Sequence, residues 1–284
     1  MTKLESCASC LDFSIDKVIK VQSSKIPSWL LKHDYVKEFV MKAPNQLKKP
    51  SKYDTKVELD LGKQYAGKKV LYWGALPKTT SDPTISDAKK AYSNFQNNGV
   101  AKIDKNGKVT FFFMCPQVYK TVAKGEKNHK TYFRHLHFCI EKDNSWQHNI
   151  YTKIVVCKYD FKKSMDMINS GLYVVINALP HQYYAKDHIP NSYNLFNKDI
   201  KKMSVNDLRK WFSEIISLHY PKLDKYIKSK KLDVYEVPII TYCAHSKCIA
   251  SELALEELMK KGFVNVCEYQ GGIQDYRKHI PQDK

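Results

Sequence analysis

The chain has 284 residues, a formal net charge of +18 and a mean hydropathy of −0.50. This length exceeds what one small core fills, so two domains are expected. The hydrophobic content of 43% argues against disorder throughout, and the sequence has no apolar run of the roughly 20 residues that a membrane helix needs. The first 17 residues mix acidic and basic side chains around no long apolar stretch, so a secretory signal is not expected. A cytoplasmic location is therefore predicted.

The basic excess is almost entirely lysine, because Arg134, Arg209 and Arg277 are the only arginines among 47 basic residues. Specific recognition of phosphates and bases depends strongly on the two-pronged arginine side chain. The lysines are also scattered rather than gathered in one tract. The composition thus argues against a specific nucleic-acid partner and leaves only weak, nonspecific affinity for polyanions.

Eight cysteines in a chain of this length are too few for a disulfide framework, so free thiols are expected. Cys7 and Cys10 form a Cys-x-x-Cys pair, which would be half of a zinc site. The sequence offers no second such pair, and a tail without a metal is the simpler interpretation.

Residues 1–50 are predicted to form a lead segment and linker. Apolar side chains in residues 24–42 suit a short amphipathic helix. The following stretch, residues 43–54, carries two prolines and three lysines, as linkers do. A boundary near residue 50 follows.

Residues 51–158 have the texture of a β-domain, with apolar or alternating stretches at four places: residues 70–73, 109–115, 132–140 and 150–160. The sequence Asp-Lys-Asn-Gly at residues 104–107 places Asn-Gly at the tip of a predicted hairpin. An antiparallel β-sandwich is predicted for this part.

From residue 160 to residue 284, strand-like and helix-like stretches alternate, which is typical of a parallel sheet covered by helices. The predicted strands are residues 173–178, 237–243 and 265–269, and the predicted helices are residues 204–218 and 250–263. The predicted fold class is therefore two-domain α+β overall, an antiparallel β-sandwich followed by an α/β domain with a parallel sheet.

The strongest chemical feature is Cys243, which ends a buried strand and is followed by a short polar loop and a helix that begins near Ala250. A thiol in this position would meet backbone N–H groups of the loop and the positive end of the helix dipole. Both stabilise a thiolate or persulfide anion. Cys243 is therefore predicted to be a nucleophile.

Three motifs around this cysteine occur in the order found in the rhodanese family: DHIPNSYNLF at residues 187–196, Tyr-Cys at the end of the strand, and VCEYQGGIQDY at residues 266–276. The C-terminal region thus resembles a rhodanese domain. This resemblance implies a sulfurtransferase that carries sulfane sulfur as a persulfide on Cys243 and needs no cofactor. Its partners would be a small-molecule or protein sulfur donor and a thiol acceptor. The active-site loop would consist of Ala244, His245, Ser246, Lys247 and Cys248.

The chain also departs from the family pattern. Asn177 and Leu179 replace the charged residues of the family's usual Asp-x-Arg, and the loop after the cysteine has no arginine to clamp a phosphate, which disfavours phosphatase chemistry. Lys247 would offer a positive charge to an anionic donor and His245 would assist proton transfer, or both would be ordinary solvated side chains. Cys248 would be either a resolving thiol or a small residue at the start of the helix.

The β-region resembles the intradiol ring-cleavage dioxygenases and their transthyretin-like sandwich. It carries Pro-x-x-Tyr ending at Tyr119 and later a His-x-His-Phe strand with His135 and His137. On a strand both histidines point to one face, so they could chelate a single metal. The resemblance implies a ferric iron held by these three residues and a second tyrosine, for which the sequence has no convincing counterpart.

Two alternatives to sulfur transfer remain open from the sequence. One is a noncatalytic binding or structural protein in which both domains have lost their chemistry. The other is a non-heme iron protein that uses the His135 and His137 strand.

Overall fold

The computed structural model describes residues 22–24, 34–122, 129–146 and 150–281. The chain divides into two compact units. Unit 1 comprises residues 1–78 and 86–155, and unit 2 comprises residues 79–85 and 156–284. In the part of the chain that the structure describes, no helix combines the length and the apolar character required to cross a bilayer.

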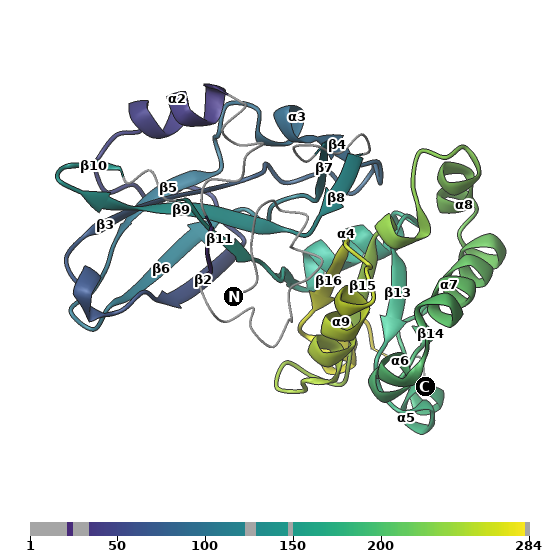
Figure 1. Cartoon of the computed structure of the whole chain (residues 1–284). Helices are drawn as coiled ribbons and strands as arrows, with labels where there is room; N and C mark the ends of the chain where they lie inside the picture. Colours follow the sequence, from purple (N-terminus) through teal and green to yellow (C-terminus); the bar gives the residue numbers. More distant parts are fainter. Residues whose placement is uncertain (1–21, 25–33, 123–128, 147–149, 282–284) are drawn as a thin grey trace. The chain divides into compact units, whose positions relative to one another are not determined.

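Unit 1 is built mainly of strands (Figure 1). They are β1 (Gln22–Ser24), β2 (Thr55–Asp60), β3 (Lys69–Gly74), β4 (Ser86–Asp87), β5 (Asn98–Lys102), β6 (Lys108–Phe113), β7 (Tyr119–Val122), β8 (His129–Tyr132), β9 (His135–Lys142), β10 (Ser145–Trp146) and β11 (Ile150–Ile154). The largest sheet has the order β1-β11-β9-β3-β5, and β10 pairs with β9 at the side. Two smaller sheets are β2-β6 and β4-β7-β8.

The core of unit 1 lies between the largest sheet and the β2-β6 pair. Phe111 of β6 stacks on Tyr72 of β3 at 4.5 Å and contacts Phe138 of β9 at 5.5 Å between ring centroids. All three side chains are almost wholly buried. Aromatic pairs at these distances add to the stability that apolar burial already supplies.

Among the described residues of unit 1 the helices are α2 (Asp34–Lys42), the 3₁₀ turn η3 (Lys63–Tyr65) and α3 (Ala88–Tyr92). The Asp87 carboxylate caps α3 by accepting a hydrogen bond from the Lys90 amide at 2.9 Å. The predicted helix of the lead segment is present in part, as α2, whereas Cys7 and Cys10 lie outside the described residues.

The predicted hairpin at residues 104–107 is only half correct. The turn is present, with a hydrogen bond from the Gly107 amide to the Asp104 carbonyl at 3.1 Å and Gly107 at a φ of 87°. However, β5 pairs with β3, whereas β6 pairs with β2. The turn therefore carries the chain from one sheet to another, and local turn chemistry does not report which sheet each flanking strand joins.

Unit 2 contains five short strands, all in one parallel sheet of order β12-β16-β15-β13-β14. They are β12 (Lys158–Tyr159), β13 (Val174–Asn177), β14 (Tyr193–Asn194), β15 (Ile239–Tyr242) and β16 (Val266–Tyr269). Every residue of β13, β15 and β16 is buried. Continuous burial is expected of parallel strands, since helices cover both faces.

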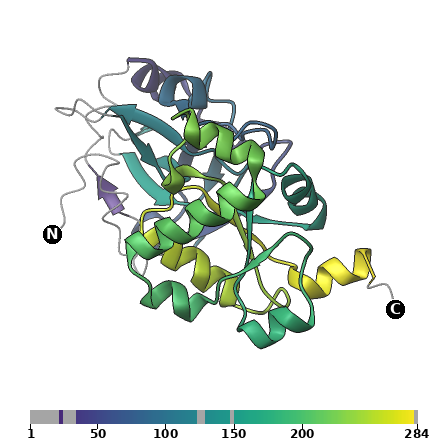
Figure 2. The same cartoon turned by 90° about the vertical axis from the view of Figure 1, so that its right-hand side faces the viewer.

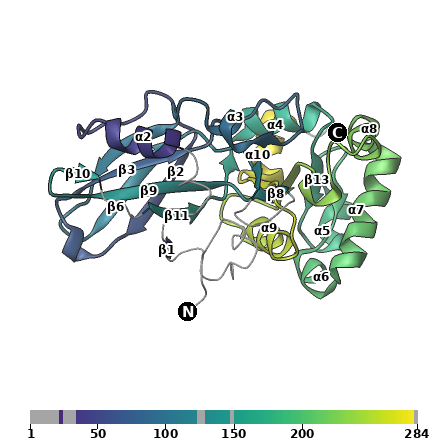
Figure 3. The ribbon, with the colours of Figure 1, turned by 45° about the horizontal axis from the view of Figure 1, so that its top comes forward.

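The helices of unit 2 are α4 (Phe161–Asn169), α5 (His181–Lys186), α6 (Asn197–Lys202), α7 (Val205–His219), α8 (Pro221–Lys228), η4 (Val234–Glu236), α9 (Ala250–Lys260) and α10 (Gly272–His279). α4 and α10 lie together on one face of the sheet, and α9 and α6 lie on the other (Figure 3). In Figure 2 the green helices α7 and α8 face the viewer. Ser204 and Asp207 form a reciprocal capping box that starts α7, as its sequence indicates.

The predicted fold class is confirmed: unit 1 has antiparallel sheets, and unit 2 has a parallel sheet with covering helices. The single strand predicted at residues 150–160 is in fact two, β11 in unit 1 and β12 in unit 2. The expectation of free thiols is also corrected in part. Cys139, Cys243, Cys248 and Cys267 are free, but Cys115 and Cys157 are disulfide-bonded.

Candidate functional site

Cys243 lies at the carboxyl end of β15, the central strand of the parallel sheet, with β16 on one side and β13 on the other. In open α/β sheets the carboxyl ends of the strands form the usual binding crevice. The sulfur of Cys243 is enclosed, because the residue is only 1% exposed. The sheet therefore fixes the position of the thiol, and the following loop controls access to it.

The loop from residue 244 to residue 249 folds back over the Cys243 sulfur. The Cys243 sulfur lies 3.2 Å from the carbonyl oxygen of Cys248 and 3.9 Å from that of His245. The Ser251 hydroxyl, in the first turn of α9, lies 3.1 Å from the same sulfur. A neutral thiol can donate to one of the carbonyls, whereas a thiolate would accept from Ser251.

A buried polar chain leads away from Cys243. The Ser251 hydroxyl is 2.6 Å from a carboxylate oxygen of Glu268 on β16, and the other Glu268 oxygen lies 3.3 Å from the Lys158 ammonium on β12. Ser251 and Glu268 are almost wholly buried. Because Ser251 has a single proton, it can serve either Glu268 or the Cys243 sulfur at any moment. The Ser251 hydroxyl can therefore donate to the sulfur when Cys243 is a thiolate and to Glu268 when Cys243 is a neutral thiol.

Cys248 is the more accessible of the two thiols and is partly buried. The Cys243 sulfur lies 3.2 Å from the Cys248 carbonyl oxygen, so the two cysteines are adjacent in the folded loop.

The two thiols differ in acidity. Burial raises the pKa of the Cys243 thiol to about 11, and its hydrogen bond to Cys248 adds to the rise. Hydrogen bonds from Ser251 act in the opposite direction but do not outweigh burial. Although burial acts to raise it, the pKa of Cys248 lies below its ordinary value because of the donors that surround its sulfur. Near neutral pH, Cys248 is thus the better source of thiolate.

The remaining loop residues surround the thiols without contacting them through polar side-chain atoms. Ala244 is partly buried, whereas His245, Ser246 and Lys247 are exposed. The Cys248 amide donates to the His245 carbonyl at 2.8 Å, which closes the turn. The structure thus brings Cys243 and Cys248 together and leaves His245 and Lys247 facing solvent.

The first turn of α10 is hydrogen-bonded to the start of the cysteine loop. The amides of Ile273 and Gln274 each donate at 2.9 Å, to the carbonyls of Cys243 and Ala244. Gly272 has a φ of 65°, and a Cβ atom there would lie 2.4 Å from the Cys243 carbonyl oxygen. A glycine is required at this position because no side chain fits between α10 and the loop.

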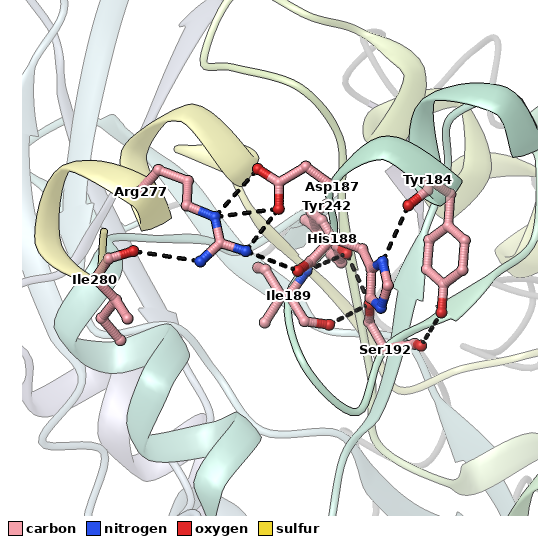
Figure 4. A network of polar contacts seen from close by, with 8 residues as sticks. All are labelled: Tyr184, Asp187, His188, Ile189, Ser192, Tyr242, Arg277 and Ile280. Atoms are coloured by element: carbon pink, nitrogen blue, oxygen red, sulfur yellow. Dashed lines mark hydrogen bonds and ion pairs between the residues drawn. The ribbon is translucent and has the colours of Figure 1, made fainter. Parts of the chain in front are cut away.

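A second network of polar contacts connects the DHIPNS segment, residues 187–192, with Tyr242 and with Arg277 (Figure 4). Arg277 of α10 binds Asp187 through two nitrogens, with Nη2 at 2.6 Å and Nε at 3.1 Å from Oδ1. The Tyr242 hydroxyl accepts from the Ile189 amide at 3.0 Å and contacts the Ser192 hydroxyl at 2.7 Å. The DHIPNS segment is therefore tied both to α10 and to the end of the strand that carries Cys243.

These features define unit 2 as an α/β domain with a cysteine loop at the carboxyl end of its central strand. Residues 160–279 match the family model of the Rhodanese-like domain, so this part of the chain is a rhodanese-like domain. No curated protein matches the chain by sequence.

Several solved structures are similar to it. The human single-domain sulfurtransferase TSTD1 is 12% identical, with 45% of this chain and 100% of that chain covered and a TM-score of 0.32. The Saccharomyces cerevisiae single-domain sulfurtransferase RDL2 is also 12% identical, with 44% of this chain and 92% of that chain covered and a TM-score of 0.32. An uncharacterized protein from Saccharomyces cerevisiae is 18% identical, with 45% of this chain and 98% of that chain covered and a TM-score of 0.32.

A second cluster of chemically active side chains lies in unit 1. Nε2 of His135 is 3.2 Å from Nε2 of His137 and 2.9 Å from the hydroxyl of Tyr119. The hydroxyl of Tyr92, at the end of α3, is 3.4 Å from both His135 Nε2 and the Tyr119 hydroxyl. All four residues are at most 2% exposed. The three residues predicted from the sequence therefore meet, and they are joined by Tyr92, which sequence reasoning missed.

Four of the six distances among these atoms have the spacing expected of ligands that share one metal ion. Two ligand atoms that each bind one metal at about 2.0–2.1 Å lie about 2.8–3.4 Å apart when the angle between them is about 90–109°. The four contacts in this cluster span 2.9 to 3.4 Å. In the described residues no group of three His, Cys, Asp or Glu side chains could hold a metal, so such a site depends on the two phenols.

The hydrogen bonds behind the histidines orient them toward the cluster. His135 Nδ1 lies 2.6 Å from the Phe133 carbonyl, which only accepts, so a neutral ring carries its proton on Nδ1 and directs the Nε2 lone pair inward. His137 Nδ1 lies 3.0 Å from the Thr152 hydroxyl. Burial, with a smaller contribution from His135, holds the pKa of His137 well below its usual range. Neutral imidazoles supported from behind in this way are suited to metal binding.

Proposed function

We propose that unit 2 transfers sulfane sulfur, carried as a persulfide on Cys243, to a thiol acceptor. The observation that carries this proposal is the position of Cys243 at the carboxyl end of the central strand of a rhodanese-like domain, with a hydroxyl donor at 3.1 Å. The reaction needs no net redox change. The sulfur of Cys243 takes the outer sulfur of a donor persulfide, which leaves as a thiolate, and an acceptor thiolate later removes that sulfur.

The surroundings of Cys243 suit a stored persulfide. Its sulfur faces the hydroxyl and the backbone N–H of Ser251, at the positive end of α9. Its near-complete burial would shield a persulfide from adventitious thiols and oxidants. The chain lacks the loop arginine of phosphatase relatives, so transfer between thiols is preferred to chemistry on a phosphate ester.

Mass spectrometry of the full chain tests this function. After exposure to thiosulfate or to glutathione persulfide, the protein should gain one sulfur, about 32 Da, which a thiol reductant removes. In the wild type the added sulfur should be recovered in the tryptic peptide of residues 232–247, which contains Cys243, and Cys243→Ser should lose it from that peptide. The matched control is Cys267→Ala, because Cys267 is a buried free thiol of β16 outside the loop.

The noncatalytic alternative gives a different result. If no sulfur donor adds mass to either loop cysteine in a folded wild-type protein, the sulfurtransferase proposal is wrong and a binding role is favoured. Retention of the rhodanese-like fold would then reflect only the packing of its core.

We also propose that the cluster of Tyr92, Tyr119, His135 and His137 binds ferric iron, a second candidate function favoured by the convergence of four buried donors. Imidazole nitrogens bind iron well, and phenolate oxygens are hard anionic ligands that suit its ferric state. Bound iron would act there as a Lewis acid toward an oxygen-containing ligand. The protein contributes the fixed spacing of the donors and an enclosed, apolar setting.

Iron content and visible absorption test this site. Protein incubated with ferric iron and desalted should retain about one iron per chain and show the colour of tyrosinate bound to iron. Tyr92→Phe should weaken the colour and His137→Ala should lower the iron content, whereas Tyr72→Phe, which removes another buried phenol, should change neither. A colourless wild-type protein without retained iron would end this proposal.

A further inference from the structure

Access to the sulfur separates the two cysteines of the loop. Cys243 is 1% exposed, and its sulfur is surrounded by the carbonyls of His245 and Cys248 and by the Ser251 hydroxyl. A donor persulfide must approach its attacker along the line of the sulfur–sulfur bond that breaks. This approach to Cys243 is closed while the loop keeps its folded conformation. Cys248 is partly exposed on the same loop.

The hydrogen-bond donors of the loop also favour Cys248 as the attacking group. Although burial acts to raise it, the pKa of the Cys248 thiol lies below its ordinary value, because the Cys243 side chain and the backbone of Ala250 and Ala244 favour its charged form. Such donors stabilise a thiolate. The exposed side chain of Lys247 precedes Cys248 and supplies a positive charge next to it for an anionic donor.

We propose that Cys248 is the thiol that receives sulfur from the donor and then passes it to Cys243, a relay that rests on the proposed sulfur transfer. The donor is a low-molecular-weight persulfide. The Cys243 sulfur lies 3.2 Å from the Cys248 carbonyl oxygen, and this proximity of the two residues on one loop allows the second step without a change of fold. Cys243 then stores the sulfur out of reach of solvent.

The two steps balance in atoms and electrons. The Cys248 thiolate attacks the outer sulfur of the donor persulfide, a new sulfur–sulfur bond forms, and the donor leaves as a thiolate. Next, Cys243 gives up its proton and attacks the outer sulfur on Cys248. The bond to Cys248 breaks, and Cys248 takes the proton as its sulfur leaves. No oxidant or reductant is consumed in either step.

A time-resolved labelling experiment on the full chain tests the relay. Trypsin cleaves after Lys247, so Cys243 is recovered in the peptide of residues 232–247 and Cys248 in that of residues 248–260. Glutathione persulfide is added, samples are quenched with an alkylating reagent at successive times, and the extra sulfur is assigned to one peptide or the other. In the wild type, sulfur should appear first on Cys248 and later on Cys243.

Variants sharpen the experiment. Cys243→Ser should trap the sulfur on Cys248. Cys248→Ser should load Cys243 about tenfold more slowly, because the enclosed thiol must then react alone. Cys267→Ala, which removes a buried thiol outside the loop, should load like the wild type.

Two outcomes would overturn the relay while leaving sulfur transfer intact. They are sulfur that appears on Cys243 first and loading of Cys248→Ser at the wild-type rate. Sulfur on neither cysteine of the wild type, or a disulfide between the two tryptic peptides with release of sulfide, would instead contradict the proposed function itself. The wild-type time course decides between these outcomes even if a variant fails to fold.

Discussion

At the scale of single residues, Ser251 has two partners that compete for one proton. Its hydroxyl lies 2.6 Å from Glu268 and 3.1 Å from the Cys243 sulfur, and all three residues are buried. Ser251→Ala leaves a Glu268 oxygen without this donor, which should cost about 1–3 kcal/mol of unfolding free energy. It also removes a donor that lowers the pKa of Cys243, so alkylation of Cys243 should require a higher pH than in the wild type.

The measurements are denaturant unfolding and the pH dependence of Cys243 alkylation, followed in the peptide of residues 232–247. Ser246→Ala is the matched control, because Ser246 is an exposed serine of the same loop. An unchanged alkylation profile in Ser251→Ala would show that the hydroxyl does not act on the sulfur, whatever its effect on stability.

At the scale of elements, the attachment of α10 depends on Arg277. Its guanidinium makes two hydrogen bonds to Asp187 that also raise the pKa of Arg277, and Nη2 contacts the His188 carbonyl at 3.3 Å. Lysine offers only a point charge in place of this fork. Because the pair is about a quarter exposed, solvent screening limits its contribution.

Arg277→Lys should therefore lower the unfolding free energy by about 1 kcal/mol and slow sulfur loading, since α10 supports the Cys243 loop. Both effects are read from denaturant unfolding and from the rate of mass gain. Lys278→Ala, an exposed change on the same turn of α10, should be neutral. Full stability in Arg277→Lys would mean that α10 is held by its apolar contacts alone.

The elements also show what the sequence could predict. Strands that are buried on both faces, such as β13, β15 and β16, are visible as apolar runs, and the serine that caps α7 is visible from its spacing to Asp207. Pairing partners are not visible in this way. The turn at residues 104–107 was predicted from local residues, but the sheets of its two flanking strands depend on contacts far along the chain.

In the candidate sites, too, local features could be predicted from the sequence, whereas contacts between residues far apart in the chain could not. His135 and His137 share a face by strand periodicity, so their proximity could be predicted. Tyr92 lies more than 40 residues before His135 on a five-residue helix, and only tertiary packing brings its hydroxyl to the cluster. Likewise, residue spacing places Cys243 and Cys248 on one loop but does not reveal that burial raises the pKa of Cys243 while the pKa of Cys248 is lowered.

At the scale of the whole molecule, buried phenols and thiols make the unfolding free energy fall as pH rises in the alkaline range. Burial raises the pKa of Tyr72 and of Cys139 in unit 1 to about 12, and it raises that of Tyr242 in unit 2 to about 12. A folded-state pKa above the unfolded value means that the folded chain holds more protons between the two. The unfolding free energy must then fall as pH rises, by about 1.4 kcal/mol per pH unit for each such group.

One buried group acts in the opposite direction at lower pH. Burial lowers the pKa of Lys153 to about 8, so between about pH 8 and 10.5 the unfolded chain binds more protons at this position, and stability rises with pH there. Above about pH 10.5 the stabilising contribution of Lys153 no longer grows, and the buried phenols alone continue to lower the unfolding free energy. The steepest loss of stability is therefore expected from about pH 10.5 to 12.

Denaturant unfolding at closely spaced pH values measures this slope. The large net charge also changes over this range as lysines lose their protons, so the series is repeated at high salt, which screens interactions among exposed charges but not the ionisation of buried phenols. Tyr72→Phe and Tyr242→Phe should each make the slope shallower, although each also loses hydrogen bonds and starts from a lower stability. A slope that high salt abolishes, or that neither variant changes, would assign the alkaline loss to surface charge rather than to the buried tyrosines.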